Sequence, residues 1–222
     1  SDIAETLSEG KSVLYRFTVP EGLTSFQIVE RMKADKNLTG DIAAVPPEGA
    51  LLPDTYKFAK GMSRQALLDL MMAERTKFLE AAWANRQPDL PLKSPEEALV
   101  LASIVEKETG RNDERTRVAA VFVNRLRQGM RLQSDPTILY GLFQGQVAWG
   151  RPIYRSEIQQ KTAHNTYQID GLPPTPICTP GRATILATLA PAKTNELFFV
   201  ADGQGGHVFS TNLKDHNTAV QT

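Results

Sequence analysis

Residues 94–110 read SPEEALVLASIVEKETG, and this stretch decides the expected fold. Ser94 is a helix-capping residue, Pro95 suits the first helical position and Glu97 suits the third, so a helix is expected to begin here. Residues 98–105 are apolar nearly all round, which is typical of a helix buried at the centre of a domain. Beyond the charged end of the stretch, Gly110 is expected to stop the helix.

One glutamate at the end of this helix has the properties of a general acid. At 3.6 residues per turn, Glu108 lies on the bulkiest apolar face, whereas Glu106 lies on a less bulky one. Burial raises the pKa of a carboxyl group, and the partial negative charge of a helix C-terminus acts in the same direction. We therefore predict that Glu108 holds a proton near neutral pH and donates it. The alternative is a solvated last turn in which both glutamates are simply exposed.

Upstream of the central helix, the sequence predicts a small accessory unit. Residues 13–19 alternate in hydrophobicity as a strand does. Thr24 and Gln27 then form the pattern of a capping box, which begins a short helix. We place residues 1–45 in this strand–helix unit and residues 46–222 in the main domain.

The other segments predict a mainly helical domain that ends in a β-hairpin, so the expected fold class is α+β. Residues 63–85 form a long helix with an apolar stripe, and residues 114–128 form a partner for the central helix. Residues 197–200 and 207–209 flank a glycine-rich turn, as the two strands of a hairpin do. The stripe of the long helix consists of Leu67, Leu70, Met71 and Phe78.

Composition and motifs argue against several classes of function. Lys plus Arg and Asp plus Glu each total 25, so no net charge attracts the chain to nucleic acid or to an anionic bilayer. The single Cys178 lies among prolines and is expected to be a packed loop thiol rather than a nucleophile. The three histidines lack the spacing of a zinc site, and no serine occupies a G-x-S-x-G elbow.

Two later loops are rich in groups that can hold a polyhydroxylated, amide-bearing ligand. One covers residues 131–137 and is followed by Tyr140 and Gly141, and the other covers residues 165–167 and is followed by residues 171–177. Sugar sites combine amide and hydroxyl groups with an aromatic face, and both loops supply that mixture. Each loop also has a simpler explanation as turn chemistry, and Asp135 beside Pro136 can serve only to stabilise a turn. The candidate substrate-binding residues are Gln133, Ser134, Asp135, Tyr140, Asn165, Thr166 and Tyr167.

Several short motifs follow one another along the chain. They are LPDTY at 52–56, ASIVEKET at 102–109, VFVNRL at 121–126, QSDPT at 133–137, NTY at 165–167, GLPP at 171–174, and a final run from Phe199 through His207 to Asn217. Together these motifs resemble those of the MltG (YceG-like) family, the endolytic murein transglycosylases. The chain differs from the family pattern at His164, where Tyr is common, and at Thr175, where many relatives have Gly.

The resemblance implies a lytic transglycosylase whose catalytic residue is the second Glu of Glu-Lys-Glu-Thr, here Glu108. Such an enzyme cleaves the MurNAc–GlcNAc bond of peptidoglycan glycan strands and leaves 1,6-anhydro-MurNAc ends, without a metal or cofactor. The resemblance also implies a LysM-like accessory unit, cell-wall synthases as partners, and an N-terminal transmembrane anchor that is absent from this chain. The expected location is the extracytoplasmic face of the cytoplasmic membrane.

Two other functions stay open at the level of sequence. Members of the family have also been labelled aminodeoxychorismate lyases, which use pyridoxal phosphate. Such a lyase needs a Schiff-base lysine beside a phosphate-binding loop, and no glycine-rich loop here follows a strand and opens a helix. The second alternative is a non-catalytic module that only binds peptidoglycan.

Overall fold

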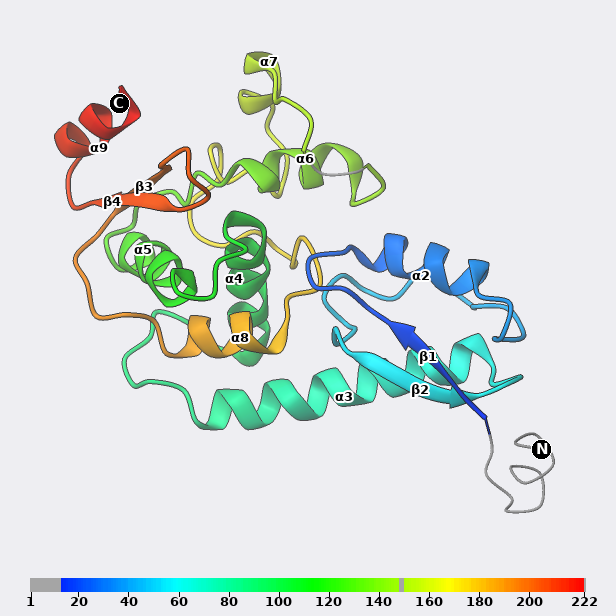
Figure 1. The fold of residues 1–222 in the computed structure, drawn as a ribbon. Helices are drawn as coiled ribbons and strands as arrows, with labels where there is room; N and C mark the ends of the chain where they lie inside the picture. The colour runs from blue at the N-terminus through cyan, green and yellow to red at the C-terminus, as the bar shows by residue number, and fades with distance from the viewer. Residues whose placement is uncertain (1–12, 148–149, 222) are drawn as a thin grey trace.

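Helix α4 (Pro95–Glu108) lies at the centre of the helical domain, as predicted (Figure 1). The computed structural model describes residues 13–147 and 150–221. Residues 98–105 of α4 are all buried, and the Ser94 hydroxyl accepts a hydrogen bond from the Glu97 amide at 3.2 Å. Helices that pack against α4 are α3 (Arg64–Ala84), α5 (Arg115–Arg127), α6 (Asp135–Phe143) and α8 (Arg182–Leu189).

The end of α4 differs from the prediction. Thr109 adopts an extended conformation (φ −145°, ψ 134°), and Gly110 does not take up the left-handed conformation expected of a glycine stop. The Thr109 hydroxyl accepts a hydrogen bond from the Arg111 amide at 3.0 Å, which fixes the direction in which the chain leaves the helix. Thr109, rather than Gly110, therefore ends α4.

The N-terminal part of the chain forms a strand–helix–strand unit. Strand β1 (Leu14–Thr18) pairs antiparallel with β2 (Thr55–Ala59), in a register that joins Leu14 to Ala59 and Thr18 to Thr55. Helix α2 (Ser25–Ala34) begins with the predicted capping box, in which Thr24 and Gln27 each accept a hydrogen bond from the other's amide. The boundary expected between residues 45 and 46 falls inside this unit, because β2 comes after it.

Helix α3 is shared between two hydrophobic cores. Its first half contributes Leu67, Leu68 and Met71 to a core with the β1–β2 sheet and α2. Its second half contributes Leu79 and Ala82 to a core with α4, α5 and α8. The predicted stripe was wrong at one position, since Leu70 is 39% exposed and Leu68 is buried in its place.

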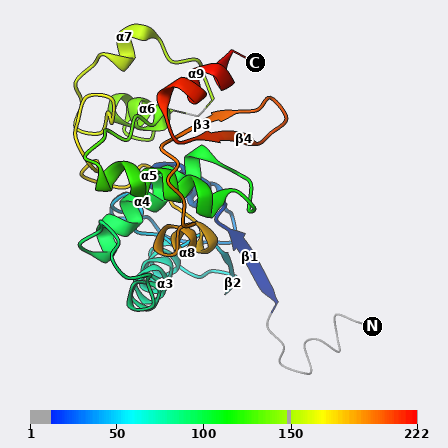
Figure 2. The same ribbon diagram turned by 90° about the vertical axis from the view of Figure 1, so that its left-hand side faces the viewer.

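The C-terminal part forms a β-hairpin followed by a helix (Figure 2). Strands β3 (Phe198–Ala201) and β4 (His207–Ser210) pair antiparallel, and α9 (Leu213–Val220) packs against both. This hairpin–helix lies beside α5, at the opposite end of the molecule from the β1–β2 sheet (Figures 1 and 2). The short helix α7 (Arg155–Ile158) follows α6 along the chain. None of the helices in the described ranges combines the length and apolar character that a membrane crossing requires.

Candidate active site

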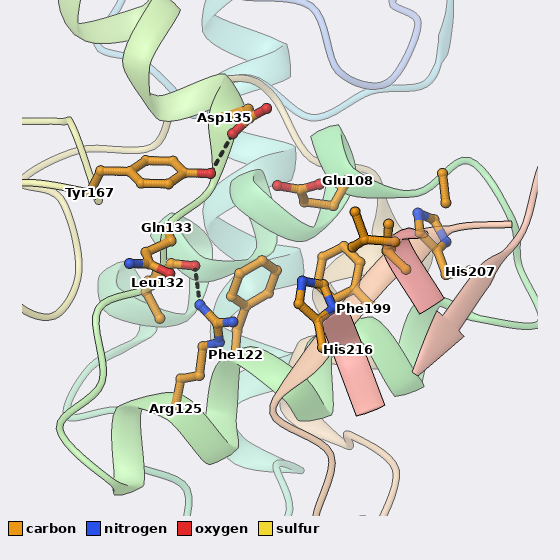
Figure 3. Close-up of a pocket in the computed structure, with 13 residues that line it drawn as sticks. Glu108, Phe122, Arg125, Leu132, Gln133, Asp135, Tyr167, Phe199, His207 and His216 are labelled. Carbon is orange, nitrogen blue, oxygen red and sulfur yellow. Dashed lines mark hydrogen bonds between the residues drawn. The ribbon is translucent and has the colours of Figure 1, made fainter. Parts of the chain in front are cut away.

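A cavity of about 370 Å³ opens at the C-terminal end of α4, with Glu108 in its wall (Figure 3). The cavity is built by segments that are far apart in sequence. Helix α4 supplies Glu108, α5 supplies Arg125, α6 supplies Asp135, and the hairpin–helix supplies His207 and His216. The predicted acid therefore lies where α4, α5, α6 and the hairpin–helix meet.

Glu108 has the environment of a carboxyl group that keeps its proton. Burial raises its pKa to about 7, and the negative charge of Asp135 acts in the same direction. A hydrogen bond from the Ser134 hydroxyl, 2.6 Å from Oε1, opposes this rise, as do the positive charges of His207 and Arg125. A pKa near 7 leaves the group able to give up a proton and to take one back, as a combined acid and base requires.

Ser134 is held in place for this contact by buried threonines. It is 1% exposed, and its amide donates to the Thr166 hydroxyl at 2.8 Å. The Thr137 hydroxyl donates to the Ser134 carbonyl at 2.6 Å. Although Ser134 occupies the N-cap position of α6, its hydroxyl makes no capping bond and donates to Glu108 instead. A capping serine that serves another group in this way is a local irregularity of the kind found at functional sites.

Asp135 and Tyr167 form the side of the cavity next to α6 (Figure 3). The Tyr167 hydroxyl donates to Asp135 Oδ1 at 2.5 Å, and the Tyr167 carbonyl accepts from Arg131 at 3.0 Å. The Asp135 side chain is exposed to the cavity. Residues 131–137 were expected to form a loop, yet Asp135 begins helix α6 with Pro136 in its first turn. The Ser-Asp-Pro signal is similar to the Ser-Pro-Glu-Glu signal that begins α4.

Glu106 lies on another face of the same helical turn. Its Oε2 accepts hydrogen bonds from the Thr184 hydroxyl and from the Gly181 amide, the latter at 3.4 Å, at the N-terminus of α8. Burial raises the pKa of Glu106, and the nearby charge of Glu21 contributes to the rise. The two glutamates thus face different partners, as the helical spacing predicts, and neither is fully exposed.

The floor of the cavity is aromatic and is tied to the C-terminal hairpin. Phe122 and Phe199 meet edge to face, with ring centroids 5.7 Å apart. The Arg125 guanidinium donates to the Leu197 carbonyl at 2.7 Å and to the Leu132 carbonyl at 3.1 Å. Arg125 therefore joins the strand that carries Phe199 to the loop that leads into α6. An apolar floor with polar groups along its rim suits the faces and hydroxyls of a sugar.

A second cavity, of about 640 Å³, shares Asp135 with the first. Lys107, Arg151 and Ile153 are among the residues that line it. The two cavities therefore adjoin each other at Asp135, in the first turn of α6.

The YceG-like family matches residues 1–222 of this chain. The chain belongs to the YceG-like family. It is 34% identical over 175 residues to a Bacillus subtilis protein named endolytic murein transglycosylase. These residues cover 78% of this chain and 47% of that protein. A Streptococcus pneumoniae protein of the same name is 33% identical over 180 residues, which cover 78% of this chain and 31% of that protein. The chain thus spans less than half the length of these relatives.

A solved structure from the same family has the same fold. The crystal structure of a YceG-like protein from Listeria monocytogenes superposes with a TM-score of 0.73 at 28% sequence identity. The match covers 98% of this chain and 80% of that one. The arrangement of helices and small sheets described above is therefore shared with another YceG-like protein.

Four of the predicted binding residues surround Glu108 in this YceG-like chain. Gln133, Asp135 and Tyr167 line the cavity, and Ser134 bonds to Glu108 itself. Gln133 has a left-handed backbone (φ 52°), which is uncommon for a residue other than glycine. Such backbone conformations occur often at active sites and ligand-binding sites.

Asn165 and Thr166 are buried behind the cavity rather than exposed in it. The Asn165 side chain accepts from the Tyr167 amide at 3.0 Å and donates to the Ile158 and Gln160 carbonyls at 3.0 and 2.7 Å. Thr166 bonds to Ser134. Their polar atoms are occupied within the protein, so we now expect them to position Tyr167 and Ser134 rather than to contact a sugar.

Tyr140 lies outside the Glu108 cavity. Its hydroxyl donates to Glu48 at 3.0 Å, and its ring packs against His164 with centroids 4.9 Å apart. His164 in turn shares a hydrogen bond with the Thr175 hydroxyl at 2.7 Å. The two positions at which this chain differs from the usual YceG-like pattern are therefore in contact with each other.

The residue-by-residue reasoning missed the cationic and aromatic side of the cavity. Arg125, Phe199, His207 and His216 all line it, and none was assigned a role from the sequence. The available signal was the C-terminal motif run, which contains Phe199, His207 and His216. Cys178 is a buried loop thiol as predicted, with its sulfur 3.2 Å from the Ser103 carbonyl oxygen.

Proposed function

We propose that this chain is the catalytic part of an endolytic lytic transglycosylase that cleaves the MurNAc–GlcNAc bond of peptidoglycan. The observation that carries the proposal is Glu108, a carboxyl group whose pKa is raised to about 7 and which faces a cavity with an aromatic floor. The names of the Bacillus and Streptococcus relatives support the same activity.

The chemistry needs one residue to act twice. Protonated Glu108 gives its proton to the glycosidic oxygen as the bond to the muramyl C1 breaks and positive charge develops on the ring. The ionised Glu108 then takes the proton from the muramyl C6 hydroxyl, whose oxygen bonds to C1 and closes the 1,6-anhydro ring. Glu108 recovers its proton, and no water is consumed.

Ser134 and Asp135 adjust Glu108 in opposite directions during this cycle. The Ser134 hydroxyl donates to the carboxyl group and supports its ionised form, whereas the charge of Asp135 supports the protonated form. A hydrolase with two carboxylates would use the second one as nucleophile or as base for water. Since Asp135 accepts a hydrogen bond from Tyr167, we assign it an electrostatic role.

An endolytic enzyme must bind a strand on both sides of the cut. The cavity at Glu108 and the larger cavity that adjoins it at Asp135 provide room for more than one sugar. We propose that a glycan strand lies along both, with Gln133 and Tyr167 contacting the sugar at the cut.

Further proposals concern the whole protein. The antiparallel β1–β2 pair with α2 between its strands supports a LysM-like unit that binds the same polymer. We propose that a single-pass anchor outside this chain holds the enzyme on the extracytoplasmic face of the cytoplasmic membrane. Cell-wall synthases are the partners that such a location favours.

Mass analysis of fragments from purified murein tests the reaction. A lytic transglycosylase yields 1,6-anhydro ends that are lighter by one water than reducing ends and resist borohydride. Reducible muramic acid would show a muramidase, and the Asp135→Asn variant would then test the missing carboxylate. If the protein binds glycan strands but cleaves none, it is a non-catalytic binding module and the proposed reaction is wrong.

A further inference from the structure

His207 is held at the edge of the cavity by a glutamate from another element. Its Nδ1 lies 2.8 Å from Glu114 Oε2, and its amide donates to Glu114 Oε1 at 3.0 Å. Both side chains are 14% exposed. Because a carboxylate can only accept, the imidazole must carry a proton on Nδ1.

This arrangement leaves the other ring nitrogen for a ligand. His207 lines the cavity, and Nε2 makes no hydrogen bond within the part of the chain that the structure describes. The ring is fixed on its remaining side by Phe199, which it meets edge-on with centroids 5.2 Å apart. A histidine oriented by a carboxylate on one nitrogen and open on the other is arranged to bind an oxygen of a ligand.

The side chains beside His207 are small and apolar. Val200 and Ala201, on the paired strand, and Val220, on α9, line the same cavity. A site with one hydrogen-bond donor next to apolar walls fits an acyl group, whose carbonyl oxygen accepts a hydrogen bond and whose methyl group packs against hydrocarbon. Murein sugars carry such groups as N-acetyl and as lactyl substituents.

The α4–α5 connection couples this histidine to the acid. Glu108 ends α4 and Glu114 is the N-cap residue of α5, so one short connection positions the acid directly and His207 through Glu114. The positive charge of His207 also lowers the pKa of Glu108. The charged or titratable groups that face Glu108 from the elements packed around it are Asp135, Tyr167, Arg125, His207 and His216.

We propose that Glu114 positions His207 to bind an acyl oxygen of the sugar next to the scissile bond, with the methyl group against Val200 and Ala201. The C-terminal hairpin thereby becomes a specificity element of the active site. The inference rests on the proposed function for the choice of ligand, and on the contacts above for the site.

Binding is measured in the Glu108→Gln background, so that cleavage does not interfere. The probes are N-acetylglucosamine oligomers, the same oligomers without their acetyl groups, and glycan strands stripped of peptides. Adding His207→Ala should weaken binding of an acylated probe about tenfold, the loss of one hydrogen bond. The deacetylated oligomers should bind the two proteins equally if N-acetyl is the group bound. A loss confined to the stripped strands would identify the lactyl group.

Two further variants separate binding from structure. Glu114→Gln keeps an acceptor for Nδ1 but removes its charge, so a smaller loss of about threefold is expected. Asp202→Ala is the matched control, because Asp202 fixes the hairpin turn by accepting from the Gln204 and Gly206 amides at 2.7 and 2.9 Å without touching His207. It should bind like the parent. With Glu108 restored, His207→Ala should also raise KM and move the alkaline limb of the activity profile to higher pH.

The outcomes distinguish this inference from the proposed function. Equal binding of every probe by the His207→Ala and Asp202→Ala proteins, with an unmoved pH limb, would overturn the acyl site and leave His207 as a structural link. Loss of acyl-dependent binding in a protein whose parent cuts no murein would support the site and reject the lyase. Melting curves of each variant confirm that the compared proteins are folded.

Discussion

The last turn of α4 carries a glutamate on each of two sides, and the two glutamates have different surroundings. On one side Glu106 meets the N-terminus of α8, where the Thr184 hydroxyl and the Gly181 amide satisfy its oxygen. On the other side Glu108 meets a cavity, and the Ser134 hydroxyl donates a hydrogen bond to it. Between them, Lys107 donates to the Gly22 carbonyl at 3.3 Å and joins the N-terminal unit to the helix.

Burial alone does not distinguish these two carboxyl groups. It is the largest cause of the raised pKa of both Glu106 and Glu108. The difference lies in what stands opposite each group: packed protein that fills its hydrogen bonds, or open space that a substrate can enter. A perturbed carboxyl group therefore indicates catalysis only when it also has room for a reacting atom.

The largest expected effect is on cleavage of murein. Glu108→Gln should lower the rate by at least about a thousandfold, because the amide keeps the shape of the side chain but has no proton to donate. Glu106→Gln should retain most of the activity, since an amide oxygen can still accept from Thr184 and Gly181. Release of soluble fragments by the purified proteins measures both. An inactive Glu106→Gln beside an active Glu108→Gln would reverse the comparison.

The pH dependence of activity sharpens the same contrast. Glu108 must be protonated to act as the acid, so kcat/KM should be level below pH 7 and fall above it as the group with pKa about 7 ionises. The fall should approach tenfold per pH unit. The Glu106→Gln protein should show the same limb. If the alkaline limb is instead lost or shifted in the Glu106→Gln protein, the titrating group is Glu106 and not Glu108.

Removal of the Ser134 hydroxyl should have a smaller effect with a specific signature. Ser134→Ala removes a donor that favours the ionised carboxyl group, so the pKa of Glu108 rises and the alkaline limb moves to higher pH. The plateau should fall about tenfold, the effect of one hydrogen bond to a charged group. Ser94→Ala is the matched control, because Ser94 caps the other end of α4. It should cost about 1 kcal/mol of stability and leave the limb where it is.

The smallest expected effects are on stability, and they have opposite signs on the two sides. Glu106→Ala should lower the free energy of unfolding by about 1–3 kcal/mol, because it leaves buried donors of α8 without an acceptor. Glu108→Gln should instead raise it by about 1 kcal/mol at pH 8. Denaturant titrations of both variants against the parent measure the two differences.

The size of the stability gain from Glu108→Gln depends on pH. Since the pKa of Glu108 is raised from 4.5 to about 7 by folding, its stabilising contribution is complete below about 4.5 and is lost as the pH rises through 7. The advantage of Glu108→Gln should therefore vanish near pH 5. An advantage that is constant between pH 5 and 8 would mean that Glu108 is not desolvated.

Local signals predicted the elements that begin with strong caps. Ser94, Thr24 and Ser63 each accept the capping hydrogen bond that their positions predict, and the helices they begin were expected from the sequence. Helical spacing also separated Glu108 from Glu106. Helix α6 was missed because its N-cap residue, Ser134, makes no capping hydrogen bond with its side chain. Its hydroxyl instead donates to Glu108 of α4, a contact that the local sequence does not encode.

The composition of the cavity could not be deduced from local patterns. Arg125 and His207 reach it because α5 and the hairpin pack together, and that packing depends on contacts such as Arg125 with the Leu197 carbonyl. Tyr140 shows the opposite error, since a plausible sugar-binding residue proves to be engaged with Glu48. Both cases concern tertiary neighbours, which spacing along one segment does not encode.

Helix α3 gives the molecule a mechanical property. It is 21 residues long, so at 1.5 Å per residue it is a rod of roughly 30 Å with one half embedded in each hydrophobic core. If one core unfolds, the half of α3 that belongs to it loses its packing while the other half stays packed. The two cores should therefore unfold together in one cooperative transition. A force applied to the β1–β2 sheet would be transmitted along the same helix toward α4.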